Sequence, residues 1–97
     1  MQNNLVDIVR QFSHRVQNNR TLSSTSSHMR GEIDELDEEI LKLNSGTEPG
    51  PDGIVGESID VIACALDIIF RHAPEITDSE LADLMLLKCQ KWEDNYK

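Results

Sequence analysis

Two pairs of acidic residues stand at helical spacing in the middle of the sequence, and each pair could help to hold a metal ion. Glu32 and Glu35 lie in the segment MRGEIDELDEEILKL, and Glu57 and Asp60 lie in the segment GESIDVIACALD. Residues three positions apart share a face of an α-helix, so each pair can direct two carboxylates toward one point. Carboxylate oxygens are the ligands that Mg²⁺ and Mn²⁺ prefer. The spacing therefore predicts an all-oxygen site for Mg²⁺, or for Mn²⁺ in its place, with these four residues as ligands.

The surroundings of the second pair strengthen this prediction. Charge runs on helices usually face solvent, so the acidic residues of the first segment could form a solvated face without any further role. The second segment differs, because Glu57, Asp60 and Asp67 fall on one narrow stripe of an otherwise almost wholly apolar helix. A carboxylate in such surroundings is costly unless it is paired or bound to a metal. Arg71 could pair with Asp67, one helical turn away, but it is too far along the helix to reach Glu57. Glu39 and Asp67 continue the two acidic stripes and are additional candidate ligands.

Other chemistries fit the sequence poorly. A di-iron centre in a helical bundle needs Glu-x-x-His on two helices, and no histidine of the chain supplies this pattern. The acidic residues of loop 44–53 do not follow the alternating ligand pattern of an EF-hand. The sequence contains no phosphate-binding loop motif and no clear Ser/His/Asp or Cys/His arrangement. Cys64 and Cys89 have neither the spacing of a zinc motif nor that of a disulfide framework, so we expect two reduced thiols.

Length and charge limit the classes of partner. The 97 residues correspond to one small domain, spanning 1–97. A net charge of −9 argues against a nucleic-acid backbone or an anionic membrane as the main partner, and it is compatible with bound cations. No apolar run is long enough to span a bilayer, and the N-terminal segment lacks the basic region and apolar core of a signal peptide. We therefore expect a cytoplasmic protein.

The elements that must position the acidic residues are four predicted helices. Apolar residues recur at helical spacing in 4–18, 27–43, 55–72 and 78–95. The second and third of these helices flank the Pro- and Gly-rich loop 44–53, which predicts a two-helix hairpin. The third is apolar around most of its circumference, which predicts burial against its neighbours and against another subunit. Since so small a chain buries only a modest core alone, the sequence predicts an all-α four-helix bundle completed by homodimerisation.

The combination of Glu-x-x-Glu, a gap and Glu-x-x-Asp in helical segments resembles a known enzyme family. It is similar to the signature of the all-α nucleoside triphosphate pyrophosphohydrolases, which include the MazG-like proteins, the dimeric dUTPases and the dCTP pyrophosphatases. The segments GEIDELDEEI and GESIDVIACAL look like the two motif helices of that family, and the resemblance covers residues 27–72. Two regions depart from the pattern. Gly31 stands where a further Glu is frequent, and the segment CQKWEDN has Cys89 and Asn95 where many members have Asn and Arg.

The resemblance implies a MazG-like bundle, as a dimer or a tetramer, and a Mg²⁺-dependent reaction. A nucleoside or deoxynucleoside triphosphate would be cut between its α and β phosphates, giving the monophosphate and pyrophosphate, in nucleotide-pool housekeeping. By the same analogy the two acidic pairs bind the metal, and Glu35 is a candidate base that activates water. Lys91, Lys88 and Trp92 are candidate phosphate and nucleotide contacts. Alternatively, the lysines only complement the helix dipole, and Trp92 serves the core or a dimer interface.

A second hypothesis is a non-enzymatic acidic helical-bundle protein that binds another protein. It would explain the net charge and the coiled-coil-like apolar seam of residues 27–43, but it leaves the acidic stripe of the apolar third helix unexplained. The two hypotheses differ in whether Mg²⁺ or Mn²⁺ stabilises the folded chain, because a ligand that binds only the folded state raises its stability.

Overall fold

The described part of the chain is helical apart from its connections. The computed structural model describes residues 4–16 and 20–96. These residues form four helices and no strand, namely α1 (Leu5–Arg15), α2 (Leu22–Ser45), α3 (Gly53–His72) and α4 (Asp78–Asn95). The all-α prediction is confirmed. The end of the predicted first helix, 17–18, and both ends of the predicted domain lie outside the described residues.

The start of α2 differs from the prediction. The apolar periodicity predicts a start near residue 27, after the Ser-rich stretch, whereas α2 begins at Leu22. Thr21 is instead the N-cap: its side chain accepts a hydrogen bond from the Ser24 N–H at 3.0 Å, and the Ser24 hydroxyl accepts one from the Thr21 N–H at 3.2 Å. This reciprocal capping box pairs N–H groups that the first turn of a helix leaves without partners, so the serines join the helix.

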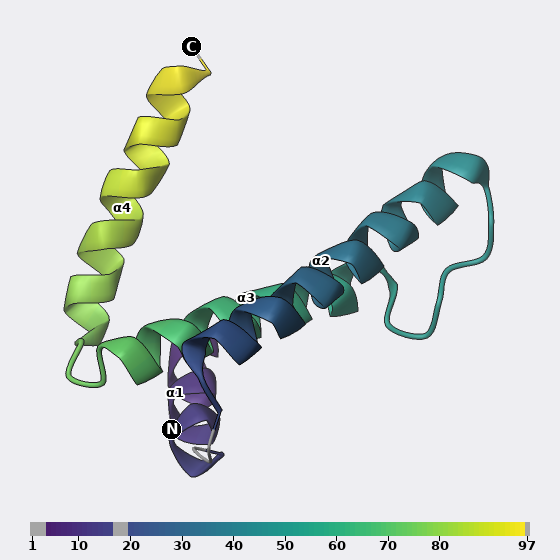
Figure 1. The fold of residues 1–97 in the computed structure, drawn as a ribbon. Coiled ribbons are helices and arrows are strands. Elements are labelled where there is room, and N and C mark those ends of the chain that lie inside the picture. The colour runs from purple at the N-terminus through teal and green to yellow at the C-terminus, as the bar shows by residue number, and fades with distance from the viewer. Residues whose placement is uncertain (1–3, 17–19, 97) are drawn as a thin grey trace.

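α2 and α3 form the predicted hairpin and lie side by side, while α1 crosses α3 (Figure 1). α2 ends at Ser45 and is capped by Gly46, whose φ of 73° is in the left-handed region that glycine adopts without strain. α1 packs on the C-terminal half of α3, where the Arg10 guanidinium lies 4.4 Å from the centre of the Phe70 ring. The hairpin therefore joins the two acidic segments, and α1 covers the other end of α3.

α4 stands apart from the other helices and points away from the hairpin (Figure 1). Its first turn is held to α1 by an ion pair of 2.6 Å between Arg10 and Asp78. No residue of α4 is buried, and Met85 and Trp92 are exposed by 64% and 65%. In the described residues α3 therefore packs against both α1 and α2, and the four-helix bundle stays a prediction. In the described residues no helix is long and apolar enough to cross a membrane.

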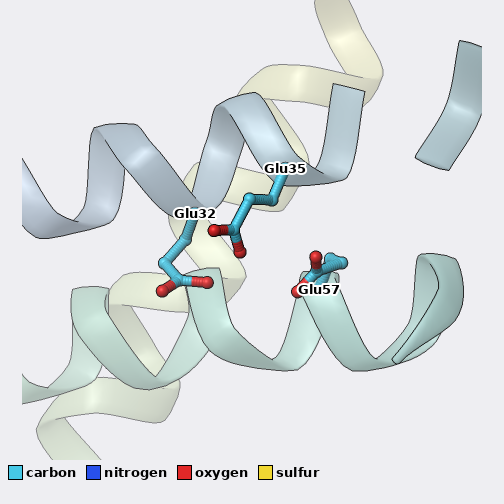
Figure 2. Close-up of side chains that lie close together, drawn as sticks. All are labelled: Glu32, Glu35 and Glu57. Carbon is cyan, nitrogen blue, oxygen red and sulfur yellow. The ribbon is translucent and has the colours of Figure 1, made fainter. Parts of the chain in front are cut away.

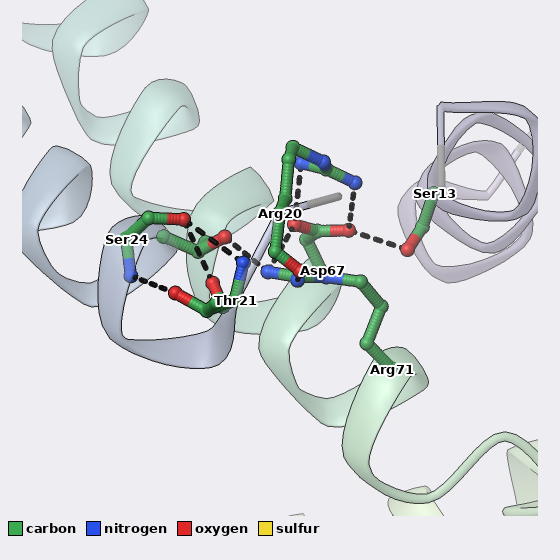
Figure 3. Close-up of polar contacts among 7 residues, drawn as sticks. Ser13, Arg20, Thr21, Ser24, Asp67 and Arg71 are labelled. Carbon is green, nitrogen blue, oxygen red and sulfur yellow. Dashed lines mark hydrogen bonds and ion pairs between the residues drawn. The ribbon is translucent and has the colours of Figure 1, made fainter. Parts of the chain in front are cut away.

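A partly buried ion-pair network fastens α1 and the start of α2 to α3 (Figure 3). Its centre is Asp67 on α3, which accepts a hydrogen bond from the Ser13 hydroxyl and lies 3.0 Å from Arg20 and 3.2 Å from Arg71. Arg71 also donates to the Arg20 carbonyl at 3.0 Å and to the Thr25 hydroxyl. The predicted pairing of Arg71 with Asp67 is confirmed. The network fixes the orientation of α2 relative to α3, and with it the relative position of the acidic segments.

Candidate metal centre

The hairpin brings three glutamates from two helices to one place. Glu32 and Glu35 on α2 face Glu57 on α3, and one carboxylate oxygen from each lies within 4.8 Å of the others. Figure 2 shows the three side chains directed into the space between the two helices. The spacing of three residues on α2 puts Glu32 and Glu35 on the face that meets α3, as the sequence predicted. This arrangement can offer carboxylate oxygens to one cation from two sides.

A second acidic group overlaps the first. Asp52, Glu57 and Asp60 also bring one carboxylate oxygen each within 4.8 Å of one another. Asp60 was predicted, whereas Asp52 was considered only as a poor match to an EF-hand loop. Asp52 is the N-cap residue of α3, yet its side chain makes no capping hydrogen bond. The signal that sequence reasoning missed is its position, because a residue at the N-cap can lie beside the acidic residues of the first two turns.

Burial gives the carboxylates of this centre unusual electrostatics. Glu57 is only 9% exposed, and its Oε1 is buried without a hydrogen-bond partner. Burial, hydrogen bonding of its protonated form with Asp60, and the negative charges of Glu35, Asp52 and Asp60 raise its pKa to about 7. For Glu32, burial and the charges of Glu35 and Asp60 likewise raise the pKa above its ordinary value. Two carboxylates therefore resist ionisation unless positive charge is supplied to them.

In the described part of the chain, basic side chains supply little of that charge. His28 lies 3.1 Å from Oε1 of Glu32, while Oε2 of Glu32 is buried without a partner. Buried polar atoms in folded proteins nearly always have a partner, so two orphan carboxylate oxygens in one cluster need an explanation. A divalent cation would provide it, since carboxylate oxygens are hard ligands and the charge would be compensated where it is buried. The donor set thus fits Mg²⁺ or Mn²⁺.

The two additional candidate ligands have other partners. Glu39 is 6% exposed and binds Lys42 at 2.9 Å and the Gly50 N–H at 3.0 Å. These hydrogen bonds, that of Lys42 first, hold the pKa of Glu39 below its ordinary value. Glu39 thereby ties the loop before α3 to α2. Asp67 belongs to the ion-pair network, so neither residue joins the two acidic groups.

The predicted nucleotide contacts lie on α4. Lys88, Lys91 and Trp92 are exposed, and Trp92 makes an edge-to-face contact with Tyr96 at 6.4 Å between ring centres. α4 leaves the end of α3 opposite to Asp52 and Glu57 and points away from the hairpin (Figure 1). The structure therefore does not bring these three residues to the acidic centre within one chain, and their role stays a prediction.

A cavity of about 710 Å³ lies between α1, α2 and α3. Its walls are mainly apolar and include Phe12 of α1, His28 of α2 and Ile59 of α3. His28 also lies 3.1 Å from Oε1 of Glu32, so this one residue connects the lining of the cavity to the acidic centre. A volume of this size is within the range of small-molecule sites.

Comparison with known proteins adds no relative. No family model, no curated protein and no solved structure matches the chain. The similarity to the MazG-like pyrophosphohydrolases therefore rests on the spacing of Glu32, Glu35, Glu57 and Asp60 in the sequence, and the function has to be argued from the geometry and charge of this centre.

Proposed function

We propose that the protein binds Mg²⁺ at the acidic centre and hydrolyses a nucleoside or deoxynucleoside triphosphate to the monophosphate and pyrophosphate. The observation that carries the proposal is the Glu57 carboxylate, which is buried, has an oxygen without a partner and faces two further glutamates across the hairpin. The ligands would be Glu32, Glu35, Glu57 and Asp60. Mn²⁺ would serve in place of Mg²⁺ because it accepts the same oxygen ligands.

The reaction suits the side chains of the centre. Bound Mg²⁺ would offset the charge of phosphate oxygens and lower the pKa of a water molecule. Glu35 is exposed, whereas Glu32 is half-buried and Glu57 is buried. Glu35 is therefore the carboxylate that water reaches most easily, which supports its proposed role in orienting or deprotonating the attacking water. The more deeply buried glutamates would hold the phosphate end of the substrate in place through the cation.

The cavity supports a nucleotide as the substrate. A triphosphate at the acidic centre would extend its nucleoside past His28 into the apolar space between the helices. Phe12 and Ile59 would contact the nucleoside, and burial of these surfaces favours binding. The cation at the acidic centre would compensate the negative charge of the triphosphate. The apolar cavity would cover the less polar nucleoside.

A homodimer would complete the fold. α4 buries none of its residues, and on α3 Val55 is 76% exposed and Ile62 is 41% exposed. Contact with a second copy would bury such apolar surface. Lys88, Lys91 and Trp92 would then reach a nucleotide only if α4 lies across the partner. Light scattering at micromolar concentration tests this arrangement, and a monomeric mass would contradict it.

The direct test is pyrophosphate release from a panel of ribo- and deoxynucleoside triphosphates, with Mg²⁺ and with EDTA. We expect metal-dependent release with a monophosphate as the second product, and we expect the Glu57→Gln variant to be inactive. Glu38→Gln is the matched control, because Glu38 is an exposed acidic residue of α2 outside both acidic groups. Absence of release across the panel, together with no effect of metal on thermal unfolding, would refute the proposal.

A protein-interaction module is the second candidate, and the exposed apolar side chains of α4 favour it. This candidate does not account for the buried glutamate. Thermal unfolding with and without Mg²⁺ separates the two functions. A site filled at 100 times its Kd adds about 2.7 kcal/mol to the stability of the folded state. For a domain of this size that is a rise in Tm of roughly 10 °C or more. An unchanged Tm in millimolar Mg²⁺ would favour the interaction module.

A further inference from the structure

We infer that the cavity between α1, α2 and α3 selects a keto purine, guanine or hypoxanthine, as the base of the triphosphate, and that Arg20 binds the O6 and N7 atoms of this base. The inference deepens the proposed function and rests on it, because it takes the nucleoside to lie in the cavity. It adds the class of base that the protein prefers and a residue that recognises this base.

The mainly apolar cavity has a group of connected polar residues in its lining. Arg20, Asp67 and the hydroxyl residues Ser13 and Thr25 all line it, and we call these four residues the polar wall. Ser13, Thr25 and Asp67 are buried, while the side chain of Arg20 is 34% exposed. Sites for small molecules are typically apolar, with a few fixed polar groups that orient the ligand and give specificity. The polar wall is therefore the part of the cavity that can distinguish one base from another.

The polar wall lies at a suitable distance from the acidic pairs. Asp67 follows Asp60 by two helical turns on α3, which is about 10 Å along the helix axis. Thr25 precedes Glu32 by the same interval on α2, which runs beside α3 in the opposite direction (Figure 1). A nucleoside extends over a similar length from its 5′ oxygen to the outer edge of its base. Phosphates held at the acidic centre would therefore bring that edge to the polar wall.

The carboxylate of the polar wall already has all the partners it can take. Oδ1 of Asp67 accepts hydrogen bonds from the Ser13 hydroxyl and from Arg20 at 3.3 Å (Figure 3). Oδ2 lies 3.0 Å from Arg20 and 3.2 Å from Arg71. A carboxylate has about four lone-pair sites, and these four contacts occupy them. Asp67 therefore has little capacity to accept a hydrogen bond from an amino group of a base.

The polar wall keeps hydrogen-bond donors for a ligand. Arg20 has five N–H groups, and its bonds to Asp67 use one on each terminal nitrogen. The Nε–H and the other N–H of the neighbouring terminal nitrogen remain, and they form a second parallel pair. The Thr25 hydroxyl accepts from Arg71, so its own proton remains to be donated. Two guanidinium groups around one carboxylate also give the wall a net positive charge, which favours a ligand edge made of acceptors.

Keto purines have the outer edge that matches such a wall. Guanine presents two neighbouring acceptors, N7 and O6, which an arginine binds with a pair of N–H groups. Hypoxanthine has the same two atoms. Adenine has a donor amino group in place of O6, cytosine has an amino donor, and thymine has a single acceptor beside its methyl group. An amino group at this position would face the N–H groups of Arg20, so we expect adenine and cytosine to bind less well.

The test compares kcat/KM of the full chain with Mg²⁺ for dGTP, dITP, dATP and dCTP. We expect kcat/KM for dGTP and dITP to exceed that for dATP by about 10-fold or more, because a good bidentate contact discriminates between bases on this scale. In 7-deaza-dGTP a C–H group replaces N7, and most of this advantage should be lost. Equal values for dGTP and dATP, or a preference for dATP or dCTP, would overturn the inference and leave the proposed function standing.

A variant of Arg20 tests whether this residue recognises the base. Arg20→Lys keeps a positive charge beside Asp67 but removes the parallel N–H groups, so the ratio of kcat/KM for dGTP to that for dATP should fall toward one. Arg30→Lys, at an exposed position of α2 outside the lining of the cavity, is the control and should keep the ratio. A merely structural role of Arg20 would lower both values and leave their ratio unchanged, which would overturn the inference. Thermal unfolding checks that each variant is folded.

Binding of nucleosides without metal separates the inference from the proposed function. In NMR spectra of the ¹⁵N-labelled chain, deoxyinosine should shift the signal of the Arg20 Nε–H, and deoxyadenosine at the same concentration should shift it much less. If no triphosphate is hydrolysed, the proposed function fails, and this difference alone decides the preference for a keto purine. Equal shifts with the two nucleosides, or no shift with deoxyinosine, would overturn the inference.

Discussion

Two buried carboxylates of α3, Asp67 and Glu57, respond to burial in opposite ways. Asp67 is 8% exposed and Glu57 is 9% exposed. Burial alone would raise the pKa of Asp67, but the hydrogen bond from Ser13 and the charges of Arg20 and Arg71 outweigh it and lower the pKa. Glu57 has acidic neighbours instead, and its pKa rises to about 7. Equal burial thus accompanies opposite shifts of the two pKa values, because positively charged neighbours surround Asp67 and negatively charged neighbours surround Glu57.

The largest effect should follow from removing the charge at Glu57. In Glu57→Gln we expect metal-dependent pyrophosphate release to fall by roughly 100-fold or more, since even groups behind a metal ligand change affinity or activity by 10–100-fold. The metal-free variant should fold, because its amide removes a buried charge that has no cation. Activity assays at saturating Mg²⁺ and unfolding without metal measure the two effects. Full activity in the variant would show that Glu57 is not a ligand.

Removal of the charge at Asp67 should lower the stability of the protein and leave its binding of Mg²⁺ unchanged. Asp67→Asn leaves the buried Arg71 without its carboxylate, and breaking a buried pair in this way costs about 3 kcal/mol of stability. The rise in Tm on adding Mg²⁺ should persist, because Asp67 lies outside both acidic groups. Urea and thermal unfolding with and without Mg²⁺ measure both quantities. Asp83→Asn, at an exposed position of α4, is the control. Loss of the metal response with unchanged stability would place Asp67 in the metal centre.

The pH dependence of stability should differ at the two residues. The pKa of Glu57 is raised, so its contribution to the metal-free protein is fully present below about 4.5 and is lost as the pH rises through about 7. The pKa of Asp67 is lowered, so its contribution is present above its ordinary value of 3.8 and is lost as the pH falls. Unfolding in urea at a series of pH values should show stability decreasing from pH 5 to pH 7. A decrease of the same size in Glu57→Gln would rule out this residue as its cause.

With Mg²⁺ present, the stability of the protein should increase from pH 5 to pH 7 instead of decreasing. A metal ligand must be ionised, so affinity for Mg²⁺ should increase as Glu57 loses its proton near pH 7. Titration of Mg²⁺ by calorimetry at both pH values measures this. If the affinity for Mg²⁺ is the same at pH 5 and pH 7, ionisation of Glu57 does not contribute to metal binding.

The smallest effect concerns the loop between the two helices. In Gly50→Ala the new Cβ would lie 2.8 Å from Oε2 of Glu39, which is itself held by Lys42. The side chain of Glu39 must shift, and we expect a loss of about 1 kcal/mol of stability with a modest weakening of Mg²⁺ binding. Gly31→Ala is the matched control, because a Cβ there has no neighbour within 4 Å. An equal loss in both variants would show that contact with Glu39 is not responsible.

Much of the fold follows from local signals in the sequence. The spacing of Glu32 and Glu35, and of Glu57 and Asp60, placed each pair on one helix face, and the loop with its glycines and prolines predicted the hairpin. The start of α2 was misplaced because a capping box at Thr21 and Ser24 turns a Ser-rich stretch into helix. Asp52 was missed because it lies outside the helical periodicity, and only the course of the loop brings it to Glu57.

The sequence by itself determined the helices, the acidic stripes and the pairing of Arg71 with Asp67, because these depend on residues within a few turns of one helix. Only the tertiary structure decided which acidic residues meet. It gave Glu39 to the Gly50 N–H, Asp67 to Ser13 and Arg20, and Asp52 to the acidic centre. Those partners are distant in the chain or belong to a loop, and a contact of that kind depends on how the helices pack rather than on the period of any one of them.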